Sequence, residues 1–223
     1  MQKQVVLFCD FDGTITEKDN IIAIMREFAL PGWEELTDQI LGQQISIREG
    51  VGKLFATIPS HRKQDIVDFL LREARIRAGF AEFIQYCKKQ DITLLITSGG
   101  IDFFVYPMLA PYGLDEHIYC NGSDFSQDTI TITWPHACDE HCTTDCGMCK
   151  TAIIRQYDPS THYRIVIGDS ITDLAGAKIA DFVIARSLLE TKCNELQLPY
   201  RPFSTFFDVI DALEQITNGQ EVR

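Results

Sequence analysis

Residues 5–14 read Val-Val-Leu-Phe-Cys-Asp-Phe-Asp-Gly-Thr, an apolar run that ends abruptly in two aspartates, Asp10 and Asp12. Five consecutive apolar residues are typical of a strand that is buried on both faces, as in the middle of a parallel sheet. Ligands of open α/β sheets bind just beyond the carboxyl ends of such strands. The stretch therefore predicts an α/β fold with a parallel sheet and two carboxylates at its binding edge.

The spacing of Asp10 and Asp12 suggests a pair of carboxylates with a chemical role. Carboxylates this close repel and raise each other's pKa unless a cation relieves them or they take different roles. A hard cation such as Mg²⁺, which prefers oxygen ligands, would relieve them. One carboxylate can then act as a nucleophile and the other as an acid and base. An ordinary strand followed by an Asp-Gly turn is the alternative that this stretch leaves open.

A second apolar run, residues 92–96, is followed by Thr-Ser-Gly-Gly at positions 97–100. A hydroxyl group and unhindered glycine amides at a strand end can cradle a phosphate, and a helix that begins nearby adds its dipole. We therefore expect Ser98 and Gly99 to bind an anion. The alternative is an ordinary turn, because Ser and Gly are common there.

A third predicted strand, residues 163–167, ends in Gly-Asp at 168–169, and Asp173 lies one helical turn further on. Asp169 would be a third carboxylate at the same edge of the sheet, with Asp173 orienting ligands or water. Helix capping by Asp169 and Ser170 is the alternative. Lys150 stands before a helical pattern and supplies a cation, although a single lysine is usually a solvated surface group.

These four segments, in this order, resemble the haloacid dehalogenase superfamily of phosphotransferases. The resemblance covers the catalytic domain from end to end and implies a Rossmann-like core with Mg²⁺ and an aspartyl-phosphate intermediate. It also implies a set of site residues: Asp10 and Asp12 for catalysis, Ser98, Gly99 and Lys150 for the phosphate, Asp10, Asp12 (through its backbone carbonyl) and Asp169 for the metal, and Asp173 in support.

Within the superfamily, the start of the chain resembles the phosphoserine phosphatase branch. Residues 134–138, Trp-Pro-His-Ala-Cys, together with the rest of the chain resemble a family of bacterial methionine-salvage phosphatases. That resemblance implies 2-hydroxy-3-keto-5-methylthiopentenyl-1-phosphate as the substrate. Gly13 stands where phosphoserine-type enzymes often have Ser, which argues against phosphoserine. The alternatives are a phosphatase of another small phosphate, such as phosphoserine or a phosphoalcohol, and a non-catalytic relative that binds phosphorylated ligands.

The segment between the first two motifs is far longer than one crossover helix requires. We predict a helical cap domain at residues 16–78, inserted into a catalytic core formed by residues 1–15 and 79–223; a helical decoration without a catalytic role is the alternative. Asn20 and Ser60 are the expected N-caps. The expected cap helices are at 20–29, 33–41, 45–58 and 62–74. Four side chains are candidates for contacting the substrate, of which the aromatic pair is more typical of the core: Glu17, Asp19, Phe28 and Trp33.

The rest of the chain alternates between helical and strand patterns. Asn121-Gly122 is a typical turn sequence, and the alternation at 129–134 that follows it predicts a small antiparallel flap. The polar tail from Gly219 is expected to fray. The other expected elements are helices at 79–90, 102–110, 171–180 and 205–217, and strands at 92–97, 117–120 and 182–185.

Half of the eight cysteines fall within twelve residues, as Cys138-x₃-Cys142-x₃-Cys146-x₂-Cys149, flanked by His136 and His141. Four thiolates at this density can hold a tetrahedral Zn²⁺ and stiffen the loop that leads to Lys150. Reduced, partly buried thiols are the equally open alternative, and a disulfide is disfavoured in the cytoplasm. The isolated cysteines are expected to be small buried side chains: Cys9, Cys87, Cys120 and Cys193.

Length and charge agree with a soluble metabolic enzyme. The 223 residues suit one α/β core with an appendage, and 45% of them are hydrophobic. A net charge of −12 argues against a nucleic-acid partner and requires local positive groups to attract an anionic substrate. The chain has no long apolar run and no signal-peptide pattern, so we expect a cytoplasmic monomer or homodimer that contacts no membrane and acts on a small phosphorylated metabolite.

Overall fold

The computed structural model describes residues 3–42 and 44–217. Within them, seven strands form one sheet in the order β4-β3-β2-β1-β5-β6-β7. The strands are β1 (Gln4–Cys9), β2 (Thr93–Ile101), β3 (Ile118–Asp124), β4 (Thr131–Thr133), β5 (His162–Gly168), β6 (Phe182–Ala185) and β7 (Tyr200–Pro202). The helices are α1 (Asn20–Phe28), α2 (Trp33–Leu41), α3 (Ile47–Phe55), α4 (Lys63–Glu73), α5 (Phe80–Lys89), α6 (Asp102–Leu109), α7 (Lys150–Arg155), α8 (Leu174–Ala177), α9 (Ser187–Leu196) and α10 (Phe206–Thr217).

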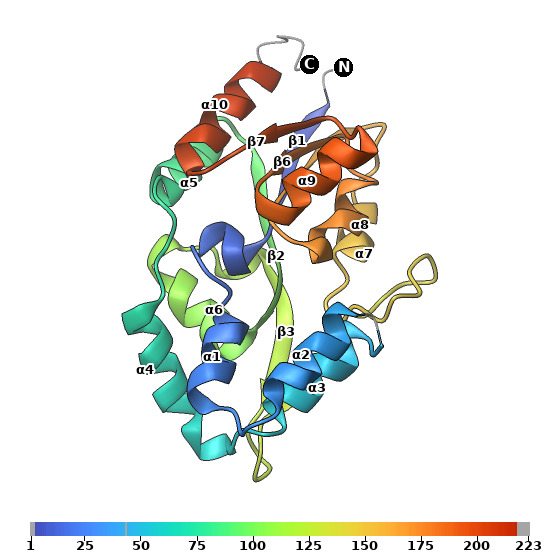
Figure 1. Ribbon diagram of the computed structural model, residues 1–223. Helices are drawn as coiled ribbons and strands as arrows, with labels where there is room; N and C mark the ends of the chain where they lie inside the picture. The colour runs from blue at the N-terminus through green and yellow to red at the C-terminus, as the bar shows by residue number, and fades with distance from the viewer. Residues whose placement is uncertain (1–2, 43, 218–223) are drawn as a thin grey trace.

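The strand that decides the fold lies at the centre of the sheet. β1 pairs in parallel with β2 on one side and with β5 on the other. Leu7 and Cys9 point into the larger core cluster, under α5, α6 and α10, whereas Val6 and Phe8 point into a second cluster with α7. Helices therefore cover both faces of the sheet (Figure 1), which confirms the predicted α/β fold and explains why the run contains no polar residue.

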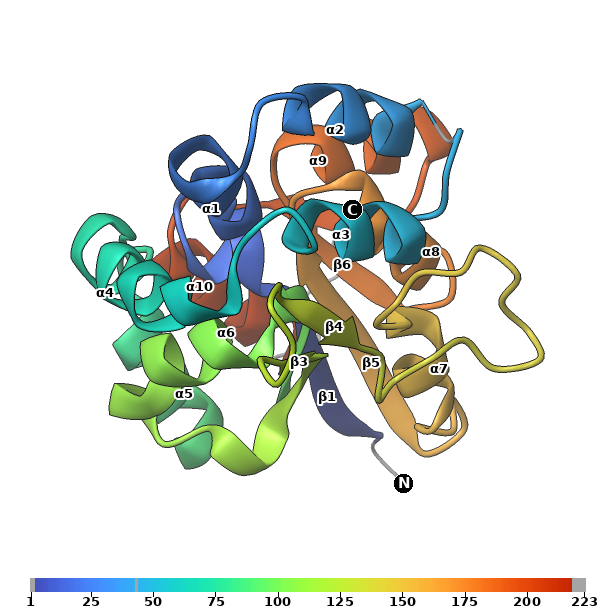
Figure 2. The ribbon, with the colours of Figure 1, turned by 90° about the horizontal axis from the view of Figure 1, so that it is seen from below.

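The antiparallel edge of the sheet matches the predicted flap, but not its turn. β3 lies beside the short β4 (Figure 2). The two strands pair with Gly122 opposite Thr133. The prediction of a turn at Asn121-Gly122 is wrong, because both residues lie inside β3. The side chain of Asn121 donates a 2.7 Å hydrogen bond to the carbonyl of Gly99, and this contact with β2 keeps the segment extended.

Two predicted helix caps are also wrong. Asp19, not Asn20, caps α1, because its side chain accepts a 2.9 Å hydrogen bond from the Ile22 amide. Asn20 is the first residue of the helix, and its amide group is used elsewhere. Ser60 begins a 3₁₀ turn (Ser60–Arg62) that precedes α4, and it does not cap that helix.

The chain after β6 contains two elements that the sequence patterns did not predict. α9 and β7 pack at the edge of the sheet, where Leu189 and Cys193 join a small cluster with Val183. The predicted helix at 171–180 is a 3₁₀ turn (Ile171–Asp173) followed by the shorter α8. The expected fraying from Gly219 lies outside the described residues.

Helices α1–α4 lie toward the carboxyl ends of the central strands, where α3 packs on α6 through the rings of Phe55 and Phe103 (Figure 1). The two chain connections to this group run side by side, since Thr16 and Ile76 form an antiparallel bridge. On either side of that bridge, the amide of Glu17 donates to the carbonyl of Arg75 at 2.9 Å, and the amide of Arg77 to that of Ile15 at 2.8 Å. None of the helices in the described ranges is both long and apolar enough to cross a membrane.

A buried arginine fixes the turn that follows β1. The guanidinium of Arg77 donates to the carbonyls of Thr14 at 2.7 Å and of Gly13 at 2.8 Å, with further bonds at 3.2 Å to Thr16 and Ser204. Arg77 is only 8% exposed, so water cannot replace these bonds readily. One side chain thus connects the turn after β1, the start of α5 and the segment before α10.

We expect Arg77→Ala to lower the free energy of unfolding by about 2–4 kcal/mol, because it leaves several buried carbonyl groups without a donor. The measurement is urea denaturation followed by circular dichroism. The control is Arg72→Ala: that side chain is 66% exposed, pairs with Glu73 and lies over the ring of Phe69, so we expect a change within about 1 kcal/mol. Equal effects of the two substitutions would contradict a structural role for Arg77.

Candidate active site

The carboxyl end of β1 carries a buried ion pair. Asp10 is only 5% exposed, and its Oδ1 lies 2.5 Å from the Nζ of Lys150. The same ammonium group contacts Oδ1 of Asp173. Lys150 is the first residue of α7, so a lysine 140 positions away along the chain is inserted between two aspartates. Lys150 is therefore a buried partner of two aspartates and not a solvated surface group.

Burial and the neighbouring charges act in opposite directions on the pKa values of this pair. Burial raises the pKa of Asp10 well above the usual range of a carboxyl group, and the neighbouring Lys150 opposes that shift. Burial would lower the pKa of Lys150, but the charges of Asp10 and Asp173 outweigh it and raise that pKa above its ordinary value. The lysine therefore stays charged and favours ionised carboxylates around it.

Asp12 lies in a tight turn and is held by its neighbours. The next residue, Gly13, has a φ of 81°, which turns the chain away from the strand direction. Oδ1 of Asp12 accepts two hydrogen bonds from Asn20, from the backbone amide at 3.0 Å and from the side chain at 2.7 Å. Burial, and then the charge of Asp19, raise the pKa of Asp12 to about 7. A carboxyl group with such a pKa can give and take a proton near neutral pH.

Two further aspartates follow β5. Asp169 accepts a 3.1 Å hydrogen bond from the hydroxyl of Thr14, which brings it against the turn after β1. The side chain of Asp173 accepts hydrogen bonds from the backbone amides of Asp169, at 3.2 Å, and Ser170, at 3.1 Å. Asp173 and Ser170 together form a capping box. Burial, and then the charge of Asp173, raise the pKa of Asp169 to about 6. The capping alternative thus applies to Ser170, while Asp169 faces Gly13.

The donor atoms of this cluster fit a hard divalent cation. One carboxylate oxygen each from Asp10, Asp169 and Asp173 lie within 4.8 Å of one another. Three carboxylates around the single ammonium of Lys150 leave excess negative charge in a buried place, and oxygen ligands are those that Mg²⁺ prefers. Asp173 is already occupied by two amides and the lysine, so Asp10 and Asp169 are the better candidates for ligands.

The pairing of β2 with β3 shifts register between Thr97 and Ile101, and this bend within β2 lies directly against Asp12. Ser98 is fully buried, and its Oγ accepts a 2.9 Å hydrogen bond from the amide of Gly100. A methyl group added at Gly100 would lie 2.8 Å from Oδ2 of Asp12 and 2.9 Å from Oγ of Ser98. Gly99 is the exposed residue of the bend. The structure therefore brings the predicted phosphate-binding segment and the predicted carboxylates together.

Several residues that support the site were not predicted. Thr14 and Asn20 orient Asp169 and Asp12, and Arg186 donates a 2.7 Å hydrogen bond to the carbonyl of Gly13. Asn20 was assigned to capping, since a local interaction is the usual role of Asn at a helix start. Arg186 has no sequence signal, because it acts on a residue 173 positions away.

The candidate substrate-contacting residues near the turn differ in surroundings. Glu17 is exposed just after the turn. Asp19 is also exposed and caps α1. Phe28 packs edge-to-face on Phe69 with ring centroids 5.4 Å apart, and Trp33 packs against the larger core cluster. The aromatic pair therefore belongs to the core, which leaves Glu17, an exposed residue beside the turn, as the better candidate for contacting the substrate.

Comparisons with known proteins find relatives that match nearly the whole chain. A protein of Brevibacillus brevis named 2-hydroxy-3-keto-5-methylthiopentenyl-1-phosphate phosphatase is 70% identical over 217 residues, which cover 97% of this chain and 98% of the relative. A protein of the same name from Geobacillus kaustophilus is 60% identical over 216 residues, with the same coverage.

Solved structures show the same fold at low identity. A phospho-aspartyl intermediate analogue of phosphoserine phosphatase aligns with a TM-score of 0.67 at 18% identity, over 98% of this chain and 99% of that one. A phosphoserine phosphatase in apo form aligns with a TM-score of 0.60 at 21% identity, over 82% and 86%. The model of the haloacid dehalogenase-like hydrolases matches residues 7–178. This match spans all four motifs, and the chain belongs to the haloacid dehalogenase-like hydrolase family.

Proposed function

We propose that this protein is a Mg²⁺-dependent phosphomonoesterase whose substrate is 2-hydroxy-3-keto-5-methylthiopentenyl-1-phosphate, an intermediate of methionine salvage. One observation supports this activity most strongly. Carboxylates that follow two different strands, β1 and β5, both contact the buried Lys150, and this group of charges lies beside the Ser98 bend. The substrate rests on the relatives named for it, of which two are 70% and 60% identical over nearly the whole chain.

Asp10 is the proposed nucleophile. Its Oδ1 is fixed by Lys150 at 2.5 Å, which leaves Oδ2 to attack phosphorus. A bond forms between Asp10 and phosphorus while the ester P–O bond breaks, and Asp12 gives its proton to the leaving alcohol oxygen. Asp12 then takes a proton from water, which attacks phosphorus, releases phosphate and restores the Asp10 carboxylate.

Asp12 suits this double role because Asn20 holds one of its oxygens and turns the other toward the Gly100 bend. This arrangement also argues against a non-catalytic phospho-ligand-binding protein, since binding an anion needs no second carboxylate. A carboxylate close to a phosphate would weaken binding unless it transfers a proton.

The phosphoryl group is held by Ser98, the amide of Gly99 and Lys150. Asp10 and Asp173 use two of the three protons of the lysine ammonium, and the third can reach a phosphoryl oxygen. Mg²⁺ would be held by Asp10, Asp169 and the backbone carbonyl of Asp12, and when bound it supplies positive charge that stabilises the transferring phosphoryl group. Fixed positive groups of this kind lower the barrier because they are in place before the reaction.

Phosphoserine is the second candidate substrate. The presence of glycine at position 13 argues against it. A methyl group added at Gly13 would collide with the carboxylate of Asp169, and the φ of 81° is strained for any other residue. The Ser that phosphoserine-type enzymes often have at this position would therefore not fit this turn without rearrangement. A panel of phosphorylated metabolites ranked by kcat/KM, with phosphoserine and a phosphoalcohol included, separates the candidates.

We further propose that residues 16–78 form a cap domain and that residues 1–15 and 79–223 form the catalytic core. The antiparallel bridge between Thr16 and Ile76 supports these boundaries, because the chain enters the cap at one of these residues and leaves it at the other. Contacts that connect the cap with the flap include an antiparallel bridge between Pro59 and Thr129, and a 3.0 Å hydrogen bond from the Ile130 amide to the Ile58 carbonyl. A cap at the ends of the strands would exclude water during phosphoryl transfer.

Asp10→Asn should lower kcat for the substrate by more than about 10³-fold, because an amide is a poor nucleophile. The measurement is phosphate release at saturating substrate, with the fold checked by circular dichroism. Asp211→Asn, at an exposed position of α10, is the matched control and should retain full activity. Turnover of folded Asp10→Asn near the wild-type rate would show that the nucleophile is another group.

Asp169→Asn should shift the activation curve for Mg²⁺ to higher concentration, by about tenfold or more, because the site loses one charged ligand. Activity is measured against Mg²⁺ concentration at fixed substrate, with Asp211→Asn again as the control. Retained activity with an unchanged metal curve would remove Asp169 from the metal site.

Glu17→Ala should change the ratio of kcat/KM between two phosphorylated metabolites by about tenfold, while turnover of a generic aryl phosphate changes much less. The reason is that an exposed cap residue beside the turn can contact the part of the substrate that leaves. Glu27→Ala, an exposed position on α1, is the matched control. If both substitutions leave this ratio of kcat/KM unchanged, Glu17 does not contribute to substrate specificity.

A further inference from the structure

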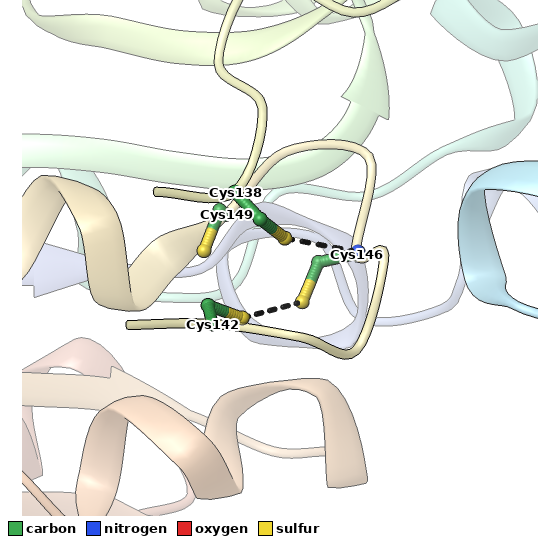
Figure 3. Close-up of side chains that lie close together, drawn as sticks. All are labelled: Cys138, Cys142, Cys146 and Cys149. Atoms are coloured by element: carbon green, nitrogen blue, oxygen red, sulfur yellow. Dashed lines mark hydrogen bonds between the residues drawn. The ribbon is translucent and has the colours of Figure 1, made fainter. Parts of the chain in front are cut away.

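The loop between β4 and α7 contains four cysteines whose side chains converge. Their Sγ atoms all lie within 4.8 Å of one another, although the residues span positions 138–149. Figure 3 shows the cluster, with the sulfurs of Cys142 and Cys146 facing each other at 3.8 Å. The described cysteines outside this loop are buried among hydrophobic side chains of the core clusters. The loop therefore gathers thiols for a reason other than hydrophobic burial.

The separations fit a metal better than a disulfide. Four sulfurs at about 2.3 Å from a tetrahedral Zn²⁺ lie about 3.8 Å from each other, which is the separation of Cys142 and Cys146. All of the remaining pairs lie within 4.8 Å, so small shifts complete the tetrahedron. A disulfide needs sulfurs about 2 Å apart, and all four of these cysteines are free thiols.

Groups that can donate hydrogen bonds lie around the sulfurs. The amide of Cys146 donates to Sγ of Cys138 at 3.4 Å. The hydroxyl of Thr144 lies 2.8 Å from Sγ of Cys146, and that of Thr151 lies 3.2 Å from Sγ of Cys149. Donors aimed at sulfur stabilise thiolates and fix the orientation of ligands around a metal.

The two histidines of the loop have other surroundings, which leaves sulfur as the ligand type. The ring of His136 packs on Tyr119 with centroids 5.2 Å apart. The backbone carbonyl of His136 accepts a 2.8 Å hydrogen bond from the amide of Cys149. His141 is exposed and lies beside Glu140. We propose that Cys138, Cys142, Cys146 and Cys149 bind one structural Zn²⁺, separate from the proposed Mg²⁺ site.

The position of the cluster gives this zinc a structural task. Cys149 directly precedes Lys150, so a metal bound to it fixes the start of α7 and with it the lysine of the active site. Arg155 of α7 makes a bidentate ion pair with Asp139, at 2.5 and 2.8 Å, and anchors the first half of the loop.

The same loop also touches the helices of the proposed cap. Asp145 accepts a 2.7 Å hydrogen bond from Ser46, the N-cap of α3, and forms a 3.5 Å ion pair with Arg48. Asp145 has a φ of 50°, an unfavourable conformation that the surrounding loop has to maintain. Zinc would therefore hold in one arrangement both the active-site lysine and the contact between loop and cap.

The test is metal analysis of the full chain, purified without added zinc and without chelator. We expect about one zinc per chain, released when four thiols are titrated with a thiol reagent. Cobalt exchanged into the site should give the intense sulfur-to-metal absorption of tetrahedral thiolate coordination. Cys142→Ser and Cys146→Ser should retain less than about a fifth of the zinc, whereas Cys193→Ala, a buried cysteine outside the loop, should retain all of it.

Two results would overturn the proposal. One is wild-type protein that stays far below one zinc per chain after incubation with Zn²⁺, while four loop thiols titrate freely. The other is a disulfide among these cysteines in protein prepared under reducing conditions. The wild-type measurements do not depend on whether a variant folds. They also do not depend on activity, so the zinc site and the proposed phosphatase function can fail separately.

Discussion

The structure depends most on the ammonium group of Lys150, which lies between Asp10 and Asp173 with little access to water. Burying these charges is costly unless each has a partner, and removing one leaves the others uncompensated. The lysine therefore fixes the relative positions of β1, α7 and the turn after β5. The single positive charge of the lysine does not balance the carboxylates around it. The excess negative charge favours a divalent cation, which can in turn bind a phosphoryl group beside it.

A second constraint is the carbonyl of Gly13, which accepts hydrogen bonds from both Arg77 and Arg186 at 2.8 and 2.7 Å. These arginines come from segments far apart in the chain and hold the turn in a shape that only glycine adopts readily. The turn directs Asp12 toward Asn20 and Thr14 toward the Asp169 carboxylate. The fold thus provides a rigid arrangement of charges before any substrate arrives, which is how electrostatic catalysis avoids reorganisation during the reaction.

The sequence predicted the central strands and the aspartates after them, because buried parallel strands are continuous apolar runs whose ends share one edge. It did not predict α9, whose only fully buried residues are Leu189 and Cys193, too few for a clear helical period. The prediction of a turn at Asn121 was wrong because the hydrogen bond from its side chain to Gly99 of β2 outweighs the local preference for a turn. Lys150 was placed by family resemblance, and Arg77 was not found, since its bonds connect positions more than 60 residues apart.

The central claim is that Asp10 forms a covalent bond to phosphorus during turnover, and chemical trapping tests it most directly. Enzyme quenched during hydrolysis is reduced with borohydride, which converts an aspartyl-phosphate to homoserine, and the digested protein is sequenced by mass spectrometry. The account predicts homoserine at position 10, only when substrate and Mg²⁺ are both present. Trapping at another residue during steady turnover, or rapid phosphate release with position 10 always unmodified, would contradict it.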